Sequence, residues 1–169
     1  MTIRPLAVAH VVLPVDNGHF WLHDGTGDGA RAGDALDDAT ASGRFVGTAG
    51  GVVTVVTPSE DSTGTPVEVE VWQAEPPSGD PAGPGWDHEV DLDLDLHTGR
   101  LDLELSTDQG GSVNGIPRGP YRLRVSGGGF APLSDHSEEP QERYRLRLWP
   151  RSCDEAPVVR IVWPGWEEY

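Results

Sequence analysis

The feature that most constrains the fold is a strict alternation of acidic and aliphatic residues between positions 89 and 105. A period of two predicts β-strands with one buried face and one solvated face. Thr98 and Gly99 interrupt the alternation, so the sequence predicts a hairpin over residues 87–106 with a two-residue turn. In that register leucine would face leucine on one side of the ribbon, and acid would face acid on the other.

Other runs with strand-like composition are separated by clusters of Gly, Pro, Asp and Ser. The expected strands lie at residues 6–14, 19–23, 45–57, 66–73, 87–96, 100–106, 120–126, 143–150 and 157–163. Residues 29–42 can form either a helix or a flexible acidic loop, because they are alanine-rich without a clear apolar stripe. The sequence therefore predicts an all-β fold, a single domain over residues 1–169 that forms an antiparallel, jelly-roll-like β-sandwich with about nine strands and little helix.

Composition limits the partners. The formal net charge is −16, and all 12 basic residues are arginine, which is typical of GC-rich bacterial coding. A strongly acidic protein is unsuited to bind nucleic acid directly, because phosphate binding needs a basic surface. The chain has no apolar run near the ~20 residues of a membrane helix. Its single cysteine, Cys153, fits a reducing compartment, so we expect a cytoplasmic protein without a membrane partner.

The acidic positions of the predicted hairpin are the main candidate binding face. They are Asp91, Asp93, Asp95, Asp102 and Glu104. Arginines alternate with apolar residues in 121–125 and 143–148, so the two sets could form one charged network if their strands share a sheet. Two interpretations stay open, a recognition surface for a partner and a solvated sheet face that balances its own charges. Carboxylates on an open face stay ionised and unspecialised, so no enzymatic activity is expected.

Tryptophans offer a second kind of binding surface. Trp72 falls on the polar face of its strand, where it is either covered by a loop or exposed to a ligand, and Trp166 is expected to be exposed near the end of the chain. Aromatic side chains beside acids are typical of sugar-binding sandwiches. A carbohydrate-binding module is therefore an alternative function.

A glycine-rich acidic loop is the metal candidate. Asp24, Asp28 and Asp34 could offer the carboxylate oxygens that calcium prefers, although the spacing of an EF-hand is absent. The competing interpretation is a solvated acidic loop. A calcium-stabilised structural domain is the third candidate function, and otherwise no cofactor is expected.

Residues 115–125 read Gly-Ile-Pro-Arg-Gly-Pro-Tyr-Arg-Leu-Arg-Val, a lead-in followed by an alternating strand. With the predicted hairpin before it and the strand at 144–149, this half of the chain resembles the competence-associated nuclease inhibitor (ComJ-like) family. The resemblance implies an intracellular β-sandwich that binds and inhibits another protein, and it assigns no individual functional residue.

The sequence therefore predicts a non-catalytic protein-binding module, an inhibitor of a basic enzyme such as a nuclease. The acidic charge suits a basic protein partner. Exposed edge strands leave both a monomer and an edge-strand dimer open.

Overall fold

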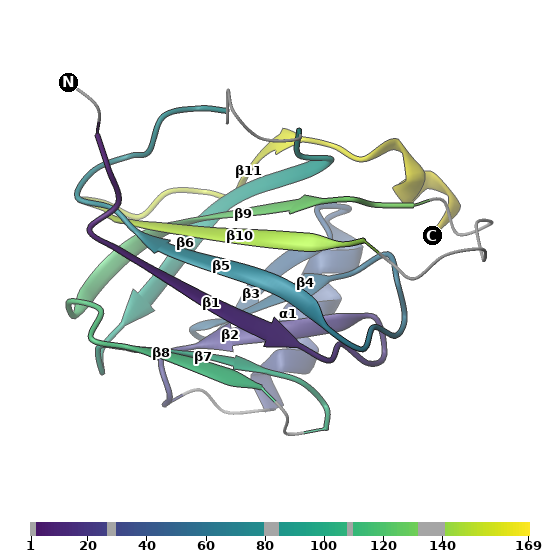
Figure 1. Cartoon of the computed structure of the whole chain (residues 1–169), viewed down its shortest axis with the longest axis horizontal. Helices are drawn as coiled ribbons and strands as arrows, with labels where there is room; N and C mark the ends of the chain where they lie inside the picture. The colour runs from purple at the N-terminus through teal and green to yellow at the C-terminus, as the bar shows by residue number, and fades with distance from the viewer. Residues whose placement is uncertain (1–2, 27–29, 80–84, 108–109, 132–140) are drawn as a thin grey trace.

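The computed structural model describes residues 3–26, 30–79, 85–107, 110–131 and 141–169, which form two packed β-sheets and one α-helix (Figure 1). Sheet A contains, in spatial order, β1 (Ala7–Leu13), β5 (Thr65–Val71), β10 (Arg143–Pro150), β9 (Gly119–Gly128), β6 (His88–Leu96) and β11 (Val158–Ile161). Sheet B contains β3 (Val46–Ala49), β4 (Val52–Val56), β2 (His19–His23), β7 (Arg100–Glu104) and β8 (Gly111–Asn114). Helix α1 (Ala30–Ala41) lies outside sheet B, and a short 3₁₀ helix, η1 (Pro164–Glu168), follows β11.

The all-β prediction is confirmed, with two sheets built from strands distant in sequence. The described residues contain eleven strands rather than about nine. The jelly-roll description is not confirmed, because β5 and β10 pair in parallel inside sheet A, whereas a jelly roll is antiparallel.

The predicted hairpin is wrong in its pairing. β6 pairs with β9 and β11 in sheet A, whereas β7 pairs with β2 and β8 in sheet B. The chain crosses between the sheets at Thr98 and Gly99, where Gly99 has φ of +77°. Asp24 holds this crossing, because its carboxylate accepts a hydrogen bond from the His97 amide at 3.1 Å and its carbonyl accepts one from the Thr98 hydroxyl. Alternation specifies which face a side chain takes, and it does not specify which strand lies alongside.

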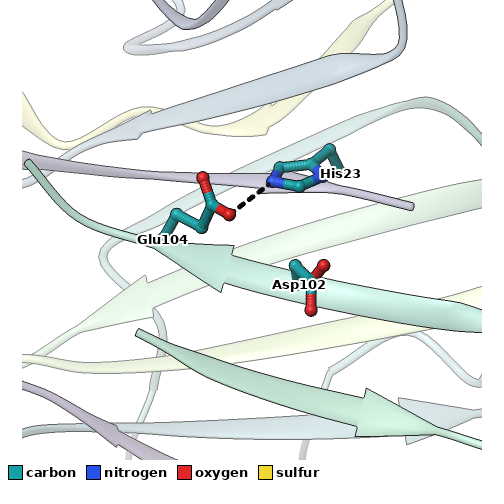
Figure 2. Close-up of side chains that lie close together, drawn as sticks. All are labelled: His23, Asp102 and Glu104. Atoms are coloured by element: carbon teal, nitrogen blue, oxygen red, sulfur yellow. Dashed lines mark ion pairs between the residues drawn. The ribbon is translucent and has the colours of Figure 1, made fainter. Parts of the chain in front are cut away.

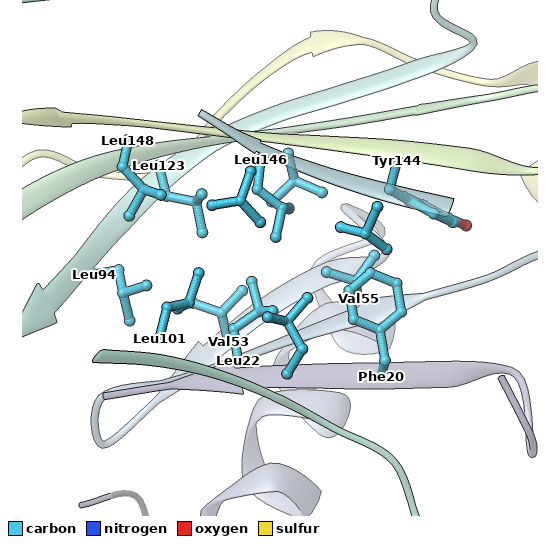
Figure 3. Packing of buried hydrophobic residues seen from close by; sticks show 14 of the residues in the cluster. Phe20, Leu22, Val53, Val55, Leu94, Leu101, Leu123, Tyr144, Leu146 and Leu148 are labelled. Atoms are coloured by element: carbon cyan, nitrogen blue, oxygen red, sulfur yellow. The ribbon is translucent and has the colours of Figure 1, made fainter. Parts of the chain in front are cut away.

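The leucines of both strands nevertheless point into one core between the sheets. Figure 3 shows Leu123, Leu146 and Leu148 from sheet A opposite Leu22 and Leu101 from sheet B, with Leu94 of sheet A beside Leu101. Each of these leucines is at most 2% exposed. Burial of apolar surface stabilises a protein by about 25 cal/mol per Å², so this layer is the main source of stability.

Helix α1 resolves the ambiguity at residues 29–42 in favour of a helix. Ala32, Ala35 and Ala39 are buried, and their spacing of three and four residues places them on one helix face. The buried face consists of alanine methyl groups, and these small side chains allow the helix to lie very close to β3. A Cβ atom added to Gly47 would lie 2.0 Å from the carbonyl oxygen of Ala35. Residues 29–42 therefore do contain an apolar stripe, and it consists of alanine.

Two strand boundaries also differ from the sequence-based expectation. The single strand expected at 45–57 is the hairpin of β3 and β4, which turns at Gly50 and Gly51, both with positive φ. A Gly-Gly pair suits a turn that needs two positive φ angles. Strand β8 was not expected, because residues 111–114 are short and polar.

Candidate functional site

Three residues of the predicted acidic face lie on the outer face of sheet A. Asp91, Asp93 and Asp95 alternate along β6, and on the neighbouring strand β9 Arg124 faces Asp91 and Arg122 faces Asp93. Arg122 Nη1 donates to Asp93 Oδ1 at 2.7 Å. The sequence expected acids and arginines to form one network if their strands shared a sheet, and on β6 and β9 they do.

Asp91 is the centre of this network. Its side chain is 1% exposed, and that of Arg124 is 0% exposed. Arg124 donates to both carboxylate oxygens, from Nε at 2.6 Å and from Nη2 at 2.9 Å, and Arg160 Nε donates at 2.5 Å. Burial raises the pKa of Asp91, but the hydrogen bonds from Arg124 and Arg160 outweigh burial and leave the pKa below its ordinary value. The carboxylate is therefore ionised and fully occupied.

Two irregular segments cover the network. Residues 72–79 bring Glu75 to Arg124 Nη2 at 3.0 Å and the carbonyl of Pro77 to Arg147 Nη1 at 3.2 Å. The segment that follows β10 brings the carbonyls of Glu155 and Ala156 to Arg122, at 3.0 and 2.8 Å. The interpretation of these residues as an open, solvated sheet face is therefore wrong for this part of sheet A.

The covered network continues toward β10. Arg147 is 2% exposed and donates to Glu89 Oε2 at 3.3 Å, an oxygen that also accepts the Ser126 hydroxyl at 2.6 Å. Trp149 lies over the guanidinium of Arg124, with 5.2 Å between the guanidinium carbon and the ring centroid. These contacts stabilise the charges internally, so the side chains are not free to meet a partner.

Asp95 lies at the edge of the network and is more open. Its carboxylate accepts Arg151 Nη2 at 2.6 Å, and its side chain is 42% exposed. The same arginine also donates to Asp154 at 2.5 Å. Asp95 is therefore the residue of the β6 set whose carboxylate a partner can reach.

The other two residues of the predicted face, Asp102 and Glu104, lie on β7 in sheet B. With His23 of β2 they form a group whose potential ligand atoms all lie within 4.8 Å of one another (Figure 2). His23 Nε2 lies 3.0 Å from Glu104 Oε1, and Trp21 Nε1 donates to Glu104 Oε2 at 3.0 Å. Asp102 Oδ1 accepts Arg100 Nε at 2.5 Å and the Ser112 hydroxyl at 2.6 Å.

The hydrogen bonds of His23 argue against a metal at this group. The Gly25 amide donates to His23 Nδ1 at 3.0 Å, so in the neutral ring the proton lies on Nε2 and points to Glu104. A metal ion on Nε2 would need that proton to move to Nδ1, where it would oppose the Gly25 N–H. The arrangement is suited to orient side chains by hydrogen bonds, and sequence reasoning did not bring His23 together with these acids.

The predicted calcium residues are not assembled in the described part of the chain. Asp24 is buried at the end of β2, and its Oδ1 accepts the Thr26 amide at 2.9 Å. Burial raises the pKa of Asp24, but the hydrogen bonds from Thr26 and His97 outweigh burial and leave the pKa below its ordinary value. The carboxylate therefore stays ionised. Asp34 lies on α1 and pairs with Arg31 at 3.3 Å. Asp28 lies outside the described residues.

Both candidate binding tryptophans are buried, so the exposure expected for Trp166 is wrong. Trp72 is 7% exposed and donates to Glu70 Oε2 at 2.7 Å. Trp166 is also 7% exposed and stacks on Phe45, with ring centroids 3.9 Å apart. Neither ring presents an open face to a ligand.

A buried histidine connects the end of the chain to both sheets. His88 of β6 is 4% exposed. Its Nε2 donates to the Arg44 carbonyl at 2.6 Å, and its Nδ1 accepts the Trp163 amide at 3.3 Å and the Trp166 indole at 3.2 Å. Burial lowers the pKa of His88, although the bond to Arg44 opposes the shift. This role of His88 could not be predicted from the sequence, because its three partners are distant along the chain.

Comparison with solved structures shows the fold of this chain in two other proteins. ComJ from Bacillus subtilis, described as an inhibitor of the DNA degrading activity of NucA, superimposes with a TM-score of 0.60 at 13% identity, over 89% of this chain and 100% of ComJ. A protein described as crocagin biosynthetic gene J gives a TM-score of 0.56 at 16% identity, over 86% of this chain and 97% of that one.

No family model and no curated protein matches the sequence. Among the described residues, no helix is long and apolar enough to cross a membrane. At these identities the similarity establishes a common fold, and it confirms the structural resemblance to the competence-associated nuclease inhibitor that residues 115–125 and the late strand suggested.

Proposed function

We propose that this chain is a non-catalytic protein-binding module that inhibits a basic enzyme such as a nuclease. The observation that supports the proposal is the fold shared with ComJ over nearly the whole of both chains. The net charge of −16 supports it further, since an acidic surface attracts a basic partner and speeds its association.

The charge available to a partner lies outside the covered network. Of the acids first considered, Asp95 and Glu104 keep side chains 42% and 44% exposed. Other acids are exposed, and they include Asp34, Asp37, Glu60, Asp61, Glu167 and Glu168. These residues replace Asp91, Asp93 and Asp102 as the groups through which a basic enzyme would be attracted.

Glu60 and Asp61 are the most suitable of the exposed acids. With Asn17 and Tyr169 they line a hollow of about 240 Å³. A concave acidic surface concentrates the electrostatic potential more strongly than a convex one. Asp34 and Asp37, in contrast, lie on the exposed side of helix α1.

The test is an inhibition assay against a panel of basic DNA-degrading enzymes that includes NucA, at low and at high salt. We expect inhibition of at least one enzyme, with weaker inhibition at high salt because screening reduces electrostatic attraction. The pair Glu60→Gln and Asp61→Asn should reduce inhibition more than the matched pair Asp34→Asn and Asp37→Asn, which removes the same charge. Absence of binding to every enzyme of the panel, measured by calorimetry, would refute the proposal.

The carbohydrate-binding alternative loses its basis, because both tryptophans that it needs at the surface are buried. The calcium alternative stays a prediction, and its test is given with the metal prediction below.

A further inference from the structure

The four edges of the two sheets differ in how they are protected against pairing with another strand. An unprotected edge offers free backbone N–H and C=O groups to a second strand, and natural proteins block it with short length, charge, proline, bulges or a covering element. At three edges such devices are present. β3 has 4 residues and lies under α1, β8 has 4 residues, and β11 has 4 residues, a register shift and Arg160.

The fourth edge, β1, carries none of these devices. It runs for 7 residues, Ala-Val-Ala-His-Val-Val-Leu, without proline or a formally charged side chain. It pairs with β5 in an unbroken register, and no strand of the described chain pairs with its other side. Figure 1 shows β1 as a long strand at the border of sheet A.

The outward side of β1 carries exposed aliphatic side chains on either side of His10, whose Nδ1 lies 3.8 Å from Glu68 Oε2. Val8 is 48% exposed and Val12 is 65% exposed, and Leu6, just before the strand, is 64% exposed. On the inward side, Val11 packs so closely on β8 that a Cβ atom on Gly111 would lie 2.5 Å from it. The strand is thus held in place while its exposed edge and apolar side chains stay open.

The sequence of β1 is complementary to itself when it runs antiparallel about His10. In that register Val8 faces Val12 of a second copy on one face and Ala9 faces Val11 on the other, and His10 faces His10 at the centre. A two-fold axis through His10 makes the interface the same for both copies. We therefore propose that β1 is a dimerisation edge, on which a second copy of this chain adds its own β1 to continue sheet A.

Net charge sets the salt dependence of this dimer. Each copy carries −16, so long-range repulsion opposes association, whereas β1 itself brings no formally charged side chain to the contact. Salt screens the repulsion, and the dimer is therefore expected to become more stable as ionic strength rises. A complex with a basic enzyme shows the opposite dependence.

Sedimentation velocity over a concentration series tests the edge. We expect the wild-type chain to form a dimer, and Val8→Lys to weaken its association by about tenfold or more, because a lysine on an edge strand opposes pairing with another strand. Val158→Lys is the matched control, since Val158 is 43% exposed on the opposite edge strand of the sheet, and it should remain dimeric. Circular dichroism confirms that both variants are folded. A wild-type chain that stays monomeric at every concentration and salt, or a Val8→Lys dimer as tight as wild type, overturns the proposal.

Disulfide trapping tests the register. Residues directly opposite in an antiparallel pair have Cβ atoms ~5 Å apart, within reach of a disulfide. His10→Cys combined with Cys153→Ser should therefore cross-link on oxidation. Val8→Cys in the same background should not, because the two positions would lie ~13 Å apart along the strands. Equal cross-linking of both variants, or none at position 10, rules out the proposed pairing.

The proposed dimer and the proposed inhibitory function can be refuted independently of each other. A monomeric chain that inhibits a nuclease would remove only the dimer, and a Val8→Lys monomer that still inhibits would show that partner binding needs one copy.

Discussion

The outer faces of the two sheets are covered in different ways. On sheet A, Asp91 is 1% exposed and is held by two arginines beneath irregular segments. On sheet B, alanines of α1 cover β3 and β4 through close steric fit, and the neighbouring Asp102 is itself buried but is held by Arg100, whose side chain is 51% exposed. Asp91 and Asp102 belong to the same alternating run and are both buried, but the partner of Asp91 is enclosed and that of Asp102 reaches water. The covering segments thus decide the environment of an outward-facing ion pair.

The strongest test of this contrast is the pair Asp91→Ala and Asp102→Ala. Asp91→Ala should lower the free energy of unfolding by about 3–5 kcal/mol, because it leaves the buried Arg124 without its main partner. Asp102→Ala should cost about 1 kcal/mol or less, because Arg100 is 51% exposed and can be solvated by water. Urea denaturation of both variants measures the difference, and equal losses would show that the two faces are electrostatically alike.

Steric fit should dominate where the helix covers sheet B. We expect Gly47→Val to lower the free energy of unfolding by about 1–3 kcal/mol, because the added side chain forces α1 away from β3. Gly33→Ala lies on the exposed side of the same helix with nothing within 4 Å, and it should raise stability by about 0.5–1 kcal/mol. Thermal unfolding measures both. A neutral Gly47→Val would mean that the helix is loosely attached.

His88 joins the two covered regions, because it bonds Arg44 beyond α1 and both Trp163 and Trp166 beyond β11. Its pKa is lowered in the folded state, so below about pH 6.5 the unfolded chain binds a proton that the folded chain does not. Stability should therefore fall with decreasing pH, by up to about 1.4 kcal/mol per pH unit.

The measurement is the free energy of unfolding as a function of pH for the wild type and for His88→Gln, which should have a shallower slope below pH ~6.5. His97→Gln, at an exposed position, is the control and should keep the wild-type slope. Identical slopes for all three proteins would contradict the role of His88.

The smallest effect is expected at the open part of sheet B. Zinc should leave the melting temperature unchanged relative to chelator, because the Gly25 amide fixes the His23 tautomer that opposes a metal. Binding to the folded state would raise the melting temperature by mass action. A rise with zinc that is lost in Glu104→Gln would establish a metal site. A rise with calcium that is lost in Asp24→Asn would establish the predicted calcium loop.

The fold class followed from the sequence because alternation determines the face on which a side chain lies. Leu94 and Leu101 reach the core as expected, even though their strands belong to different sheets. The partner strand could not be predicted, since a leucine-in, acid-out strand fits either sheet equally well. Helix α1 was ambiguous because its apolar stripe consists of alanine, which hydropathy patterns weight weakly.

The candidate site was harder to predict than the fold. Whether Asp91 or Trp166 is exposed depends on segments that contact them from 69 and 121 residues away, as the Arg160 and Phe45 contacts show. Such coverings leave no periodic signal in the sequence. His23 and Glu104 likewise meet only because β2 and β7 are neighbours in sheet B.

The position of β10 in the middle of sheet A has a consequence for how the protein is made. β10 lies between β5 and β9 and joins them, yet its residues, 143–150, leave the ribosome after those of both neighbours. Until they emerge, the outer pair β1 and β5 has no link to the rest of its sheet. The strands of sheet A that are made before β10 therefore remain an incomplete layer until that strand emerges.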